Sequence, residues 1–237
     1  MSRMVGLIGG MSWQTTALYY REINRHVNAR LGGIHSANLS IQSLDFATIG
    51  KLVSTGDFAS MTELICEAGS NLKAAGAQSL ALCANVAHKA ADDLEQRTGL
   101  PVLHIVDYTG QAVNARQLKR IGLLGTRAVM EEDFYQARLR DQYGLDVFVP
   151  NASFRTRADK DIFQELSKDE VPAKVQAQWH EAFKGLVRDH QVEGVILGCT
   201  ELRLIFRDEK LPVQTFETTS LHANGIAEWL LSDGQFA

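Results

Sequence analysis

The chain contains an internal repeat, and this repeat restricts the folds that the sequence can adopt. The segment Gly6-Leu-Ile-Gly-Gly10 returns 116 residues later as Gly122-Leu-Leu-Gly-Thr126. A second pair, Leu80-Ala-Leu-Cys-Ala-Asn85 and Val195-Ile-Leu-Gly-Cys-Thr200, is separated by 115 residues. Each copy is a short apolar run that ends at small or polar residues, which is the pattern of a buried strand leading into a turn. The repeat therefore predicts two similar α/β halves.

Short strand-like runs alternate with longer segments of helical period along the whole chain. Because parallel strands need a crossover between them, the alternation predicts parallel sheets flanked by helices. One helix is expected after Asp57 as its N-cap and before Gly76, and another over about 172–190, each with one apolar face. Eight strands are expected: Val5–Gly9, Ala37–Gln42, Ser79–Cys83, Val102–Ile105, Ile121–Leu124, Val147–Val149, Gly194–Leu197 and Val213–Phe216.

The repeated turns indicate where a ligand binds. In open parallel sheets, ligands bind beyond the carboxyl ends of the strands. If the two halves face one another, the four repeated turns converge there. We therefore expect the site in a cleft between the halves.

The composition makes a small molecule the expected partner. The chain has 237 residues, of which 45% are hydrophobic and 22% charged, with a net charge of −4 and so no basic excess for nucleic acid. No apolar run approaches the ~18 residues of a membrane span, and the start shows no signal-peptide pattern, so we expect a cytoplasmic protein. Cys66, Cys83 and Cys199 form no CxxC pair and the seven histidines contain no HExxH motif, so we expect free thiols and no metal.

Two registers of the second repeat decide which thiol faces the ligand. An offset of 116 pairs Cys83 with Cys199, whereas an offset of 115 pairs Ala84 with Cys199 and also Asn85 with Thr200. We prefer an offset of 115 because it also aligns the polar residues Asn85 and Thr200. A shift of one residue turns a side chain to the opposite face of a strand. In this register Ala84 and Cys199 face the ligand, and Cys83 points into the packing.

Cys199 has the sequence context of a reactive thiol. It follows a buried strand and Gly198, and it precedes Thr200-Glu201, where a helix is expected to begin. Free N–H groups and the helix dipole at such a position lower a thiol pKa below its usual ~8.5. We therefore expect Cys199 to be the reactive cysteine. Cys66, in the middle of a helix, is expected to be a small buried hydrophobe.

Several motifs occur in order along the chain: Gly9-Gly10-Met11-Ser12-Trp13, Asn85–His88, Leu123–Thr126 followed by Met130–Tyr135, Gly198–Glu201, and Phe216–His222. Together they resemble the aspartate/glutamate racemase superfamily, whose members work without pyridoxal phosphate. The resemblance implies two flavodoxin-like halves related by a pseudo-two-fold axis, no cofactor, an amino-acid or carboxylate substrate and a homodimer. It also implies a first half of residues 1–113 completed by the tail 215–237, and a second half of residues 114–214.

The resemblance also assigns roles to single residues. Members of the superfamily have one cysteine in a Cys-Asn-Thr-Ala-His motif and another in Gly-Cys-Thr-Glu, and these thiols remove and return the α-proton on opposite faces of the substrate Cα. Cys199 matches the second thiol, and Ala84 occupies the position of the first. Asn85 matches the family's amide at this position, and the resemblance implies that this amide binds a substrate carboxylate. Val86 replaces the usual Thr and Glu217 an acid that is usually Asp, so the chain has one evident acid/base thiol.

The other expected substrate contacts come from turns and from one basic segment. Backbone N–H groups and hydroxyls at strand-to-helix turns can stabilise the charge that forms on the substrate carboxylate. The second carboxylate of a dicarboxylic substrate requires a nearby cation. We expect the cluster of Arg155, Arg157 and Lys160 to supply it, and we include Arg157 and Lys160 in the proposed site. Ser12 is explained equally well as a helix N-cap. The turn residues in the proposed site are Met11, Ser12, Asn85, Val86, Thr126 and Thr200.

The leading hypothesis is a cofactor-independent racemase-type isomerase acting on aspartate or glutamate. Since Ala84 can neither donate nor accept a proton, the racemase activity of this chain should be reduced or altered. A water or another group replaces the first thiol, or the chemistry has changed, or the alanine is an engineered inactivation. The alternatives are a single-thiol decarboxylase or lyase, as in the related arylmalonate decarboxylases, and a non-catalytic small-molecule binding protein. His88, His104 and His222 are expected to be hydrogen-bonded structural residues.

Overall fold

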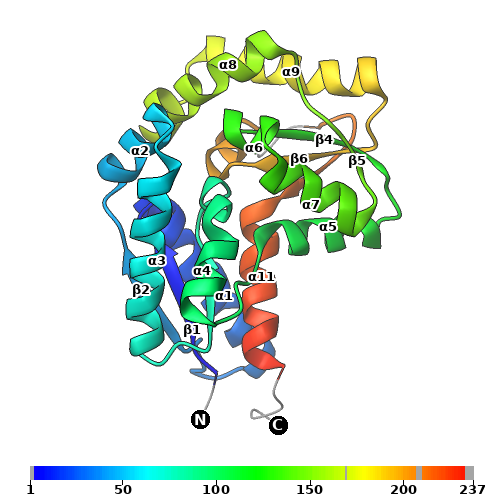
Figure 1. Ribbon diagram of the computed structural model, residues 1–237. Coiled ribbons are helices and arrows are strands. Elements are labelled where there is room, and N and C mark those ends of the chain that lie inside the picture. Colours follow the sequence, from blue (N-terminus) through cyan, green and yellow to red (C-terminus); the bar gives the residue numbers. More distant parts are fainter. Residues whose placement is uncertain (1–2, 169, 207–209, 233–237) are drawn as a thin grey trace. The chain divides into compact units, whose positions relative to one another are not determined.

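The computed structural model describes residues 3–168, 170–206 and 210–232 of the chain. Contacts between residues divide the chain into two compact units: unit 1 is Met1–Ile105 with Thr219–Ala237, and unit 2 is Val106–Thr218. Each unit is a parallel sheet flanked by helices (Figure 1), which confirms the predicted fold class. The domain boundaries inferred from the sequence stay a prediction. None of the helices in the described ranges is long and apolar enough to cross a membrane.

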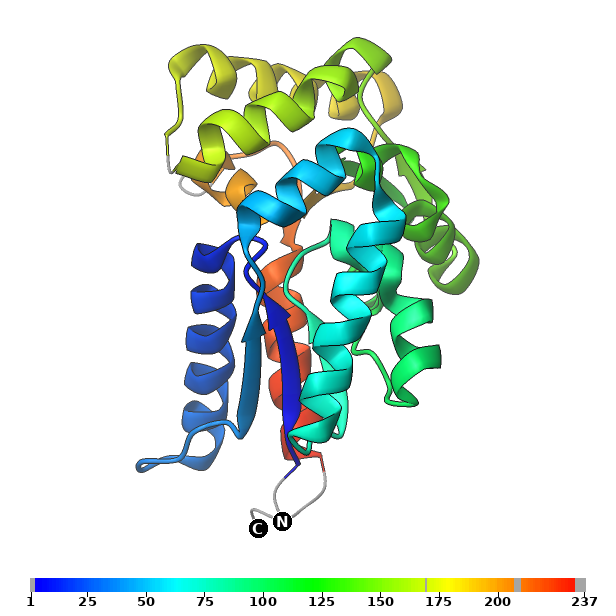
Figure 2. The ribbon, with the colours of Figure 1, turned by 60° about the vertical axis from the view of Figure 1, so that its left-hand side comes forward.

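Unit 1 is built on the strand order β2-β1-β3, with every neighbouring pair parallel. Figure 2 shows α1 and α3 on opposite sides of β1 and β2. Helix α11 lies along α1, since Glu228 of α11 accepts hydrogen bonds from His26 at 2.6 Å and Arg30 at 2.7 Å. The elements are β1 (Val5–Gly9), α1 (Trp13–Leu31), β2 (Leu39–Ser43), α2 (Phe46–Thr55), α3 (Phe58–Ala74), β3 (Ser79–Leu82), a 3₁₀ turn (Val86–Ala90), α4 (Ala91–Thr98) and α11 (Thr218–Leu231).

Helix α3 shows how the sequence forms the core of unit 1. Asp57 is its N-cap and accepts the backbone N–H of Ser60 at 3.1 Å. The helix ends just before Gly76, whose φ of +98° lies in the region that glycine tolerates. The predicted apolar face packs against the sheet: Met61, Ile65, Ala68 and Leu72 are buried, and Leu64 is partly buried. Both the helix and its buried face are therefore confirmed.

Unit 2 is built on the strand order β5-β4-β6-β7, again with every pair parallel. The helix predicted over 172–190 is confirmed as α9, and its buried face consists of Val175, Trp179, Phe183 and Leu186. In Figure 1, α9 lies on one side of β4 and β6, and α5 and α7 lie on the other. The elements are α5 (Ile105–Ala115), β4 (Arg120–Gly125), α6 (Arg127–Glu131), α7 (Asp133–Tyr143), β5 (Asp146–Phe148), α8 (Ala152–Lys160), α9 (Ala173–His190), β6 (Gly194–Gly198), α10 (Arg203–Phe206) and β7 (Gln214–Glu217).

The two sheets repeat the same topology. In unit 1, β1 lies between β2 and β3, and in unit 2, β4 lies between β5 and β6. In unit 2, β7 pairs with β6. At the corresponding place beside β3, unit 1 has one isolated parallel bridge, between Leu80 and Val102. The strand predicted at 102–105 is therefore wrong. The N–H of Leu103 does donate to Leu80 O at 2.8 Å, but the chain enters α5 at Ile105 and the pairing stops there.

A polar contact fixes α8 against α9 inside unit 2. Trp179 is completely buried, and its indole Nε1–H donates to Asp161 Oδ2 at 3.1 Å. Arg157 Nε donates to the same oxygen at 3.2 Å. Asp161 is only 5% exposed and begins a π-helical turn, Asp161–Glu165, that follows α8. A buried carboxylate without such partners would be strongly destabilising, so the guanidinium and the indole explain why it is tolerated.

Candidate active site

The turn after β1 is held in shape by the first turn of α1. Gly10 has φ of +85°, and a Cβ there would lie 1.9 Å from Leu44 O, so only glycine fits. Thr16 Oγ1 accepts the N–H of Gly10 at 2.8 Å and donates to Ser12 O at 2.9 Å. The Ser12 hydroxyl accepts the N–H of Thr15 at 3.3 Å, and Ser12 is 2% exposed. The Ser12 side chain is thus an N-cap, and the adjoining backbone groups are what this turn offers to a ligand.

The turn after β3 carries Ala84, at which the sequence predicts a missing thiol. Cys83 is completely buried, and burial raises the pKa of its thiol. Ala84, the next residue, is partly exposed. The two side chains therefore differ in burial as the 115-residue register predicts. Asn85 is 6% exposed and Val86 is 8% exposed, as is Met11 from the β1 turn.

Three histidines pack together beside this turn. The rings of His88 and His104 are 4.6 Å apart between centroids, and those of His88 and His222 are 5.6 Å apart. His222 Nε2 lies 2.6 Å from Leu103 O, and its Nδ1 lies 2.8 Å from the Tyr19 hydroxyl. Burial lowers the pKa of His222 well below its usual value, and the neighbouring His88 lowers it further. His88 and His222 are hydrogen-bonded, as predicted, and His104 packs its ring against that of His88.

The buried histidine predicts an acid-sensitive fold. The unfolded chain binds a proton at His222 near its ordinary pKa of about 6.5, whereas the folded chain does not, so the free energy of unfolding should fall as the pH drops below about 6.5. Urea unfolding between about pH 8 and pH 5, followed by circular dichroism, measures this slope. His222→Gln should flatten the slope and His35→Gln, at an exposed position, should keep it. An unchanged slope in His222→Gln would contradict the assignment.

The turn after β4 is also a helix cap. Thr126 is 5% exposed, and its hydroxyl accepts the N–H of Val129 at 3.4 Å. Asp159 Oδ1, from α8, accepts the N–H of Arg127 at 2.7 Å. Burial raises the pKa of the Asp159 carboxyl, and its bond to Arg127 opposes that shift. The first N–H groups of α6 are thus satisfied by a hydroxyl and by a carboxylate.

Cys199 directly follows β6 and is paired with an acid. Its Sγ donates to Glu201 Oε2 at 2.9 Å. Desolvation, followed by the charge of Glu201, raises the thiol pKa well above its usual value, with a further contribution from Asp159. The lowered pKa expected from the sequence is therefore wrong. The following helical segments are short, Thr200–Leu202 and Arg203–Phe206, and offer little dipole, while two carboxylates lie nearby. Cys199 is a protonated thiol at neutral pH.

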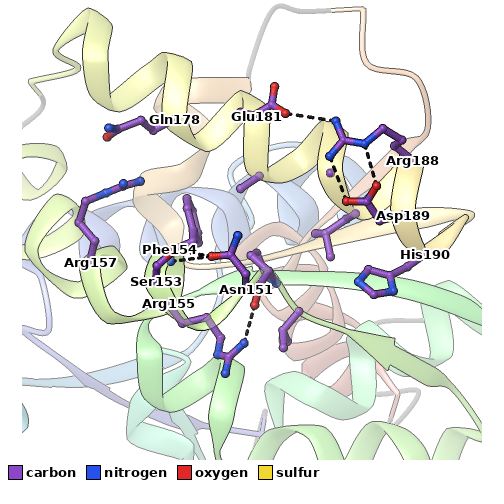
Figure 3. A pocket seen from close by; sticks show the side chains of 15 residues that line it. Asn151, Ser153, Phe154, Arg155, Arg157, Gln178, Glu181, Arg188, Asp189 and His190 are labelled. Atoms are coloured by element: carbon purple, nitrogen blue, oxygen red, sulfur yellow. Dashed lines mark hydrogen bonds and ion pairs between the residues drawn. The ribbon is translucent and has the colours of Figure 1, made fainter.

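The basic residues of α8 have different surroundings. Arg155 pairs with Glu131 at 2.9 Å, and Arg157 with Asp161. Arg157 also lines a cavity of about 450 Å³ between α8 and α9, shown in Figure 3. The residues lining this cavity do not include Cys199 or any other residue of the strand-end turns in the proposed site. Lys160, the last residue of α8, is exposed and has no ion pair within the described part of the chain.

Two acids near Cys199 were not singled out from the sequence. Glu201 had a signal, because a residue two positions after a strand-end thiol in a tight turn can fold back on the sulfur. Asp159 had none, since it comes from a different helix. In the described ranges no three His, Cys, Asp or Glu side chains are arranged to hold a metal ion.

The fold and the turns define a class: an α/β protein of two units with the same strand order, carrying a thiol at a strand-to-helix turn. A family model described as Asp/Glu/Hydantoin racemase matches residues 8–226. The chain belongs to this family.

Relatives of known structure or function agree with this membership. A candidate Asp/Glu racemase from Yersinia pestis is 40% identical, with a TM-score of 0.88 over 97% of this chain and 99% of that one. An aspartate racemase homologue from Pyrococcus horikoshii OT3 is 28% identical, with a TM-score of 0.77 over 97% and 99% of the two chains. The glutamate racemase of Aquifex aeolicus is 27% identical over 144 residues, which are 60% of this chain and only 53% of that protein.

Proposed function

We propose that this chain is a cofactor-independent isomerase of a small acidic amino acid, aspartate or glutamate, with Cys199 as its one evident acid/base thiol. The observation that carries the proposal is the hydrogen bond from Cys199 to Glu201 at the end of β6, in a chain of the racemase family. Relatives whose names specify aspartate or glutamate support this substrate class. Ala84 occupies the opposite thiol position. A cytoplasmic homodimer stays a prediction.

The Cys199–Glu201 pair can deliver and recover a proton. In one direction the neutral thiol gives its proton to the substrate carbanion, so that a C–H bond forms at Cα and a thiolate remains. In the other direction Glu201 takes the thiol proton, and the thiolate then removes the α-proton, leaving its electron pair on the substrate. Because the thiol pKa is raised, the protonated form dominates at neutral pH. The resting site is therefore prepared for proton delivery.

The substrate needs contacts at both of its carboxylates. Charge that develops on the α-carboxylate is stabilised by preorganised N–H donors. We assign this role to backbone groups, because the hydroxyls of Ser12 and Thr126 already serve as caps. Lys160 is the better candidate for the second carboxylate, since its ammonium is exposed while Arg157 is engaged with Asp161. The proposed contacts are Met11, Ser12, Asn85, Val86, Thr126 and Thr200 through their turns, with Lys160 and Arg157 as the basic pair.

Solvent deuterium exchange tests this function. With one thiol, exchange of the α-proton should be faster for one enantiomer than for the other, and inversion should be slow. Each of L- and D-aspartate and L- and D-glutamate is incubated with the protein in D₂O, and loss of the α-proton signal is followed by NMR. Binding without exchange, both in the native chain and in Ala84→Cys, would contradict an isomerase and support a binding protein.

One observation favours a second candidate function. A single protonated thiol without an opposite partner suits an enzyme that protonates an enediolate from one face, as a decarboxylase or lyase of a malonate-type substrate does. Release of carbon dioxide from an arylmalonate, with no exchange of the amino acids, would establish this alternative.

A further inference from the structure

His88 lies between two backbone groups of opposite hydrogen-bonding character. Its Nδ1 is 2.9 Å from Ala84 O, and its Nε2 is 3.1 Å from the backbone nitrogen of Ile105. A carbonyl oxygen only accepts, and a backbone N–H only donates. The ring must therefore carry its proton on Nδ1 and a lone pair on Nε2. His88 is 2% exposed and is fixed as one neutral tautomer.

His222 is held in the opposite tautomer. Its Nε2 lies 2.6 Å from the carbonyl oxygen of Leu103, so that this nitrogen carries the proton. Its Nδ1 must then accept, and the Tyr19 hydroxyl donates to it over 2.8 Å. His222 is completely buried. Two neighbouring histidines of unit 1 are thus uncharged, with their protons on different nitrogens.

The backbone groups that these two rings contact lie at the Ala84 turn and near the point where the chain leaves unit 1. Ala84 is the position of the missing thiol, and Ile105 is both the first residue of α5 and the last residue of the first segment of unit 1. Leu103 precedes Ile105 by two residues. His222 follows the point where the chain re-enters unit 1 at Thr219. The histidines therefore join the Ala84 turn to the segment through which the chain leaves unit 1.

We propose that His88 is a positioning residue for the Ala84 turn: as a neutral Nδ1–H imidazole it ties the Ala84 carbonyl to the first N–H of α5, while His222 in the Nε2–H form holds Leu103. The backbone at Ala84 sets where any side chain at that position points. His88 is not an acid or base of the reaction, since a second proton on Nε2 would face the N–H of Ile105. Only the link to turnover rests on the proposed function; the tautomers do not.

Histidine tautomers can be measured without any activity. Long-range ¹H–¹⁵N correlation spectra of the full chain labelled with ¹⁵N-histidine distinguish a protonated from an unprotonated ring nitrogen. At neutral pH we expect Nδ1–H for His88 and Nε2–H for His222, with signals assigned from His88→Asn and His222→Gln. An Nε2–H or a doubly protonated ring for His88 would overturn the proposal. Failure of the exchange assay alone would leave these spectra unchanged, so the two failures are distinguishable.

A pair of variants tests the positioning role in the Ala84→Cys background. His88→Asn places an amide N–H near the position of Nδ1 and keeps a donor for Ala84 O, whereas His88→Leu removes it. We expect kcat for α-proton exchange to fall at least about tenfold in His88→Leu and to be largely restored in His88→Asn, with KM little changed in both. Thermal unfolding identifies any loss due to stability alone. Equal losses of kcat in two variants of equal stability would refute positioning.

Discussion

Replacing Ala84 by cysteine should raise the rate of racemisation of aspartate or glutamate by about 10²–10⁴-fold, the usual contribution of one positioned acid or base. The methyl group of Ala84 carries no transferable proton, and a thiol there would supply the second group that inversion requires. Ala84 is partly exposed, so an added sulfur should strain the core less than it would at a fully buried position. The conversion of L- to D-amino acid, followed by circular dichroism, measures the rate.

Two controls separate this effect from the addition of a thiol in general. Ala75→Cys adds a cysteine at an exposed position in unit 1, just after α3 and before β3, and should leave the rate unchanged. Cys83→Ala, combined with Ala84→Cys, tests the register, because a buried Cys83 should not be needed. A folded Ala84→Cys protein with no gain in racemisation would disprove the assignment of this position.

Cys199→Ser should lower the rate of α-proton exchange by about 10²–10⁴-fold, in the native chain and in Ala84→Cys alike. A serine hydroxyl keeps the size and the hydrogen bond to Glu201 but is far less acidic than a thiol. The matched control is Cys66→Ala, which removes a buried cysteine of α3 that is 1% exposed. Exchange that survives in Cys199→Ser would show that another group is the base.

Much of the fold is predicted from the sequence, because the alternation of strand-like and helical segments predicts parallel sheets and the internal repeat predicts two similar halves. The register of the second repeat also predicts that Cys83 is buried beside a more exposed Ala84. The segment 102–105 was misassigned, since its apolar residues suit a strand but α5 begins at Ile105 and leaves one bridge. Local pattern does not encode where the next helix starts.

The site was less predictable than the fold because its chemistry depends on contacts between distant residues. The thiol pKa of Cys199 was misjudged from its place after a strand, since Asp159 is brought near it by a separate helix. The tautomer of His88 depends in the same way on Ile105, 17 residues along the chain. Sequence spacing identifies the candidate residues, whereas their protonation states come from tertiary structure.

The contact between Trp179 and Asp161 gives unit 2 its own optical reporter. The other tryptophans, Trp13 and Trp229, belong to unit 1, and Trp13 is 66% exposed, while Trp179 is completely buried. A buried indole emits at shorter wavelength than a solvated one and shifts to the red when its surroundings open. In a protein with phenylalanine at positions 13 and 229, tryptophan fluorescence, excited selectively over that of tyrosine, would follow unit 2 alone. Comparing the melting of this signal with that of the whole chain, followed by circular dichroism, then shows whether the two units melt together or one after the other.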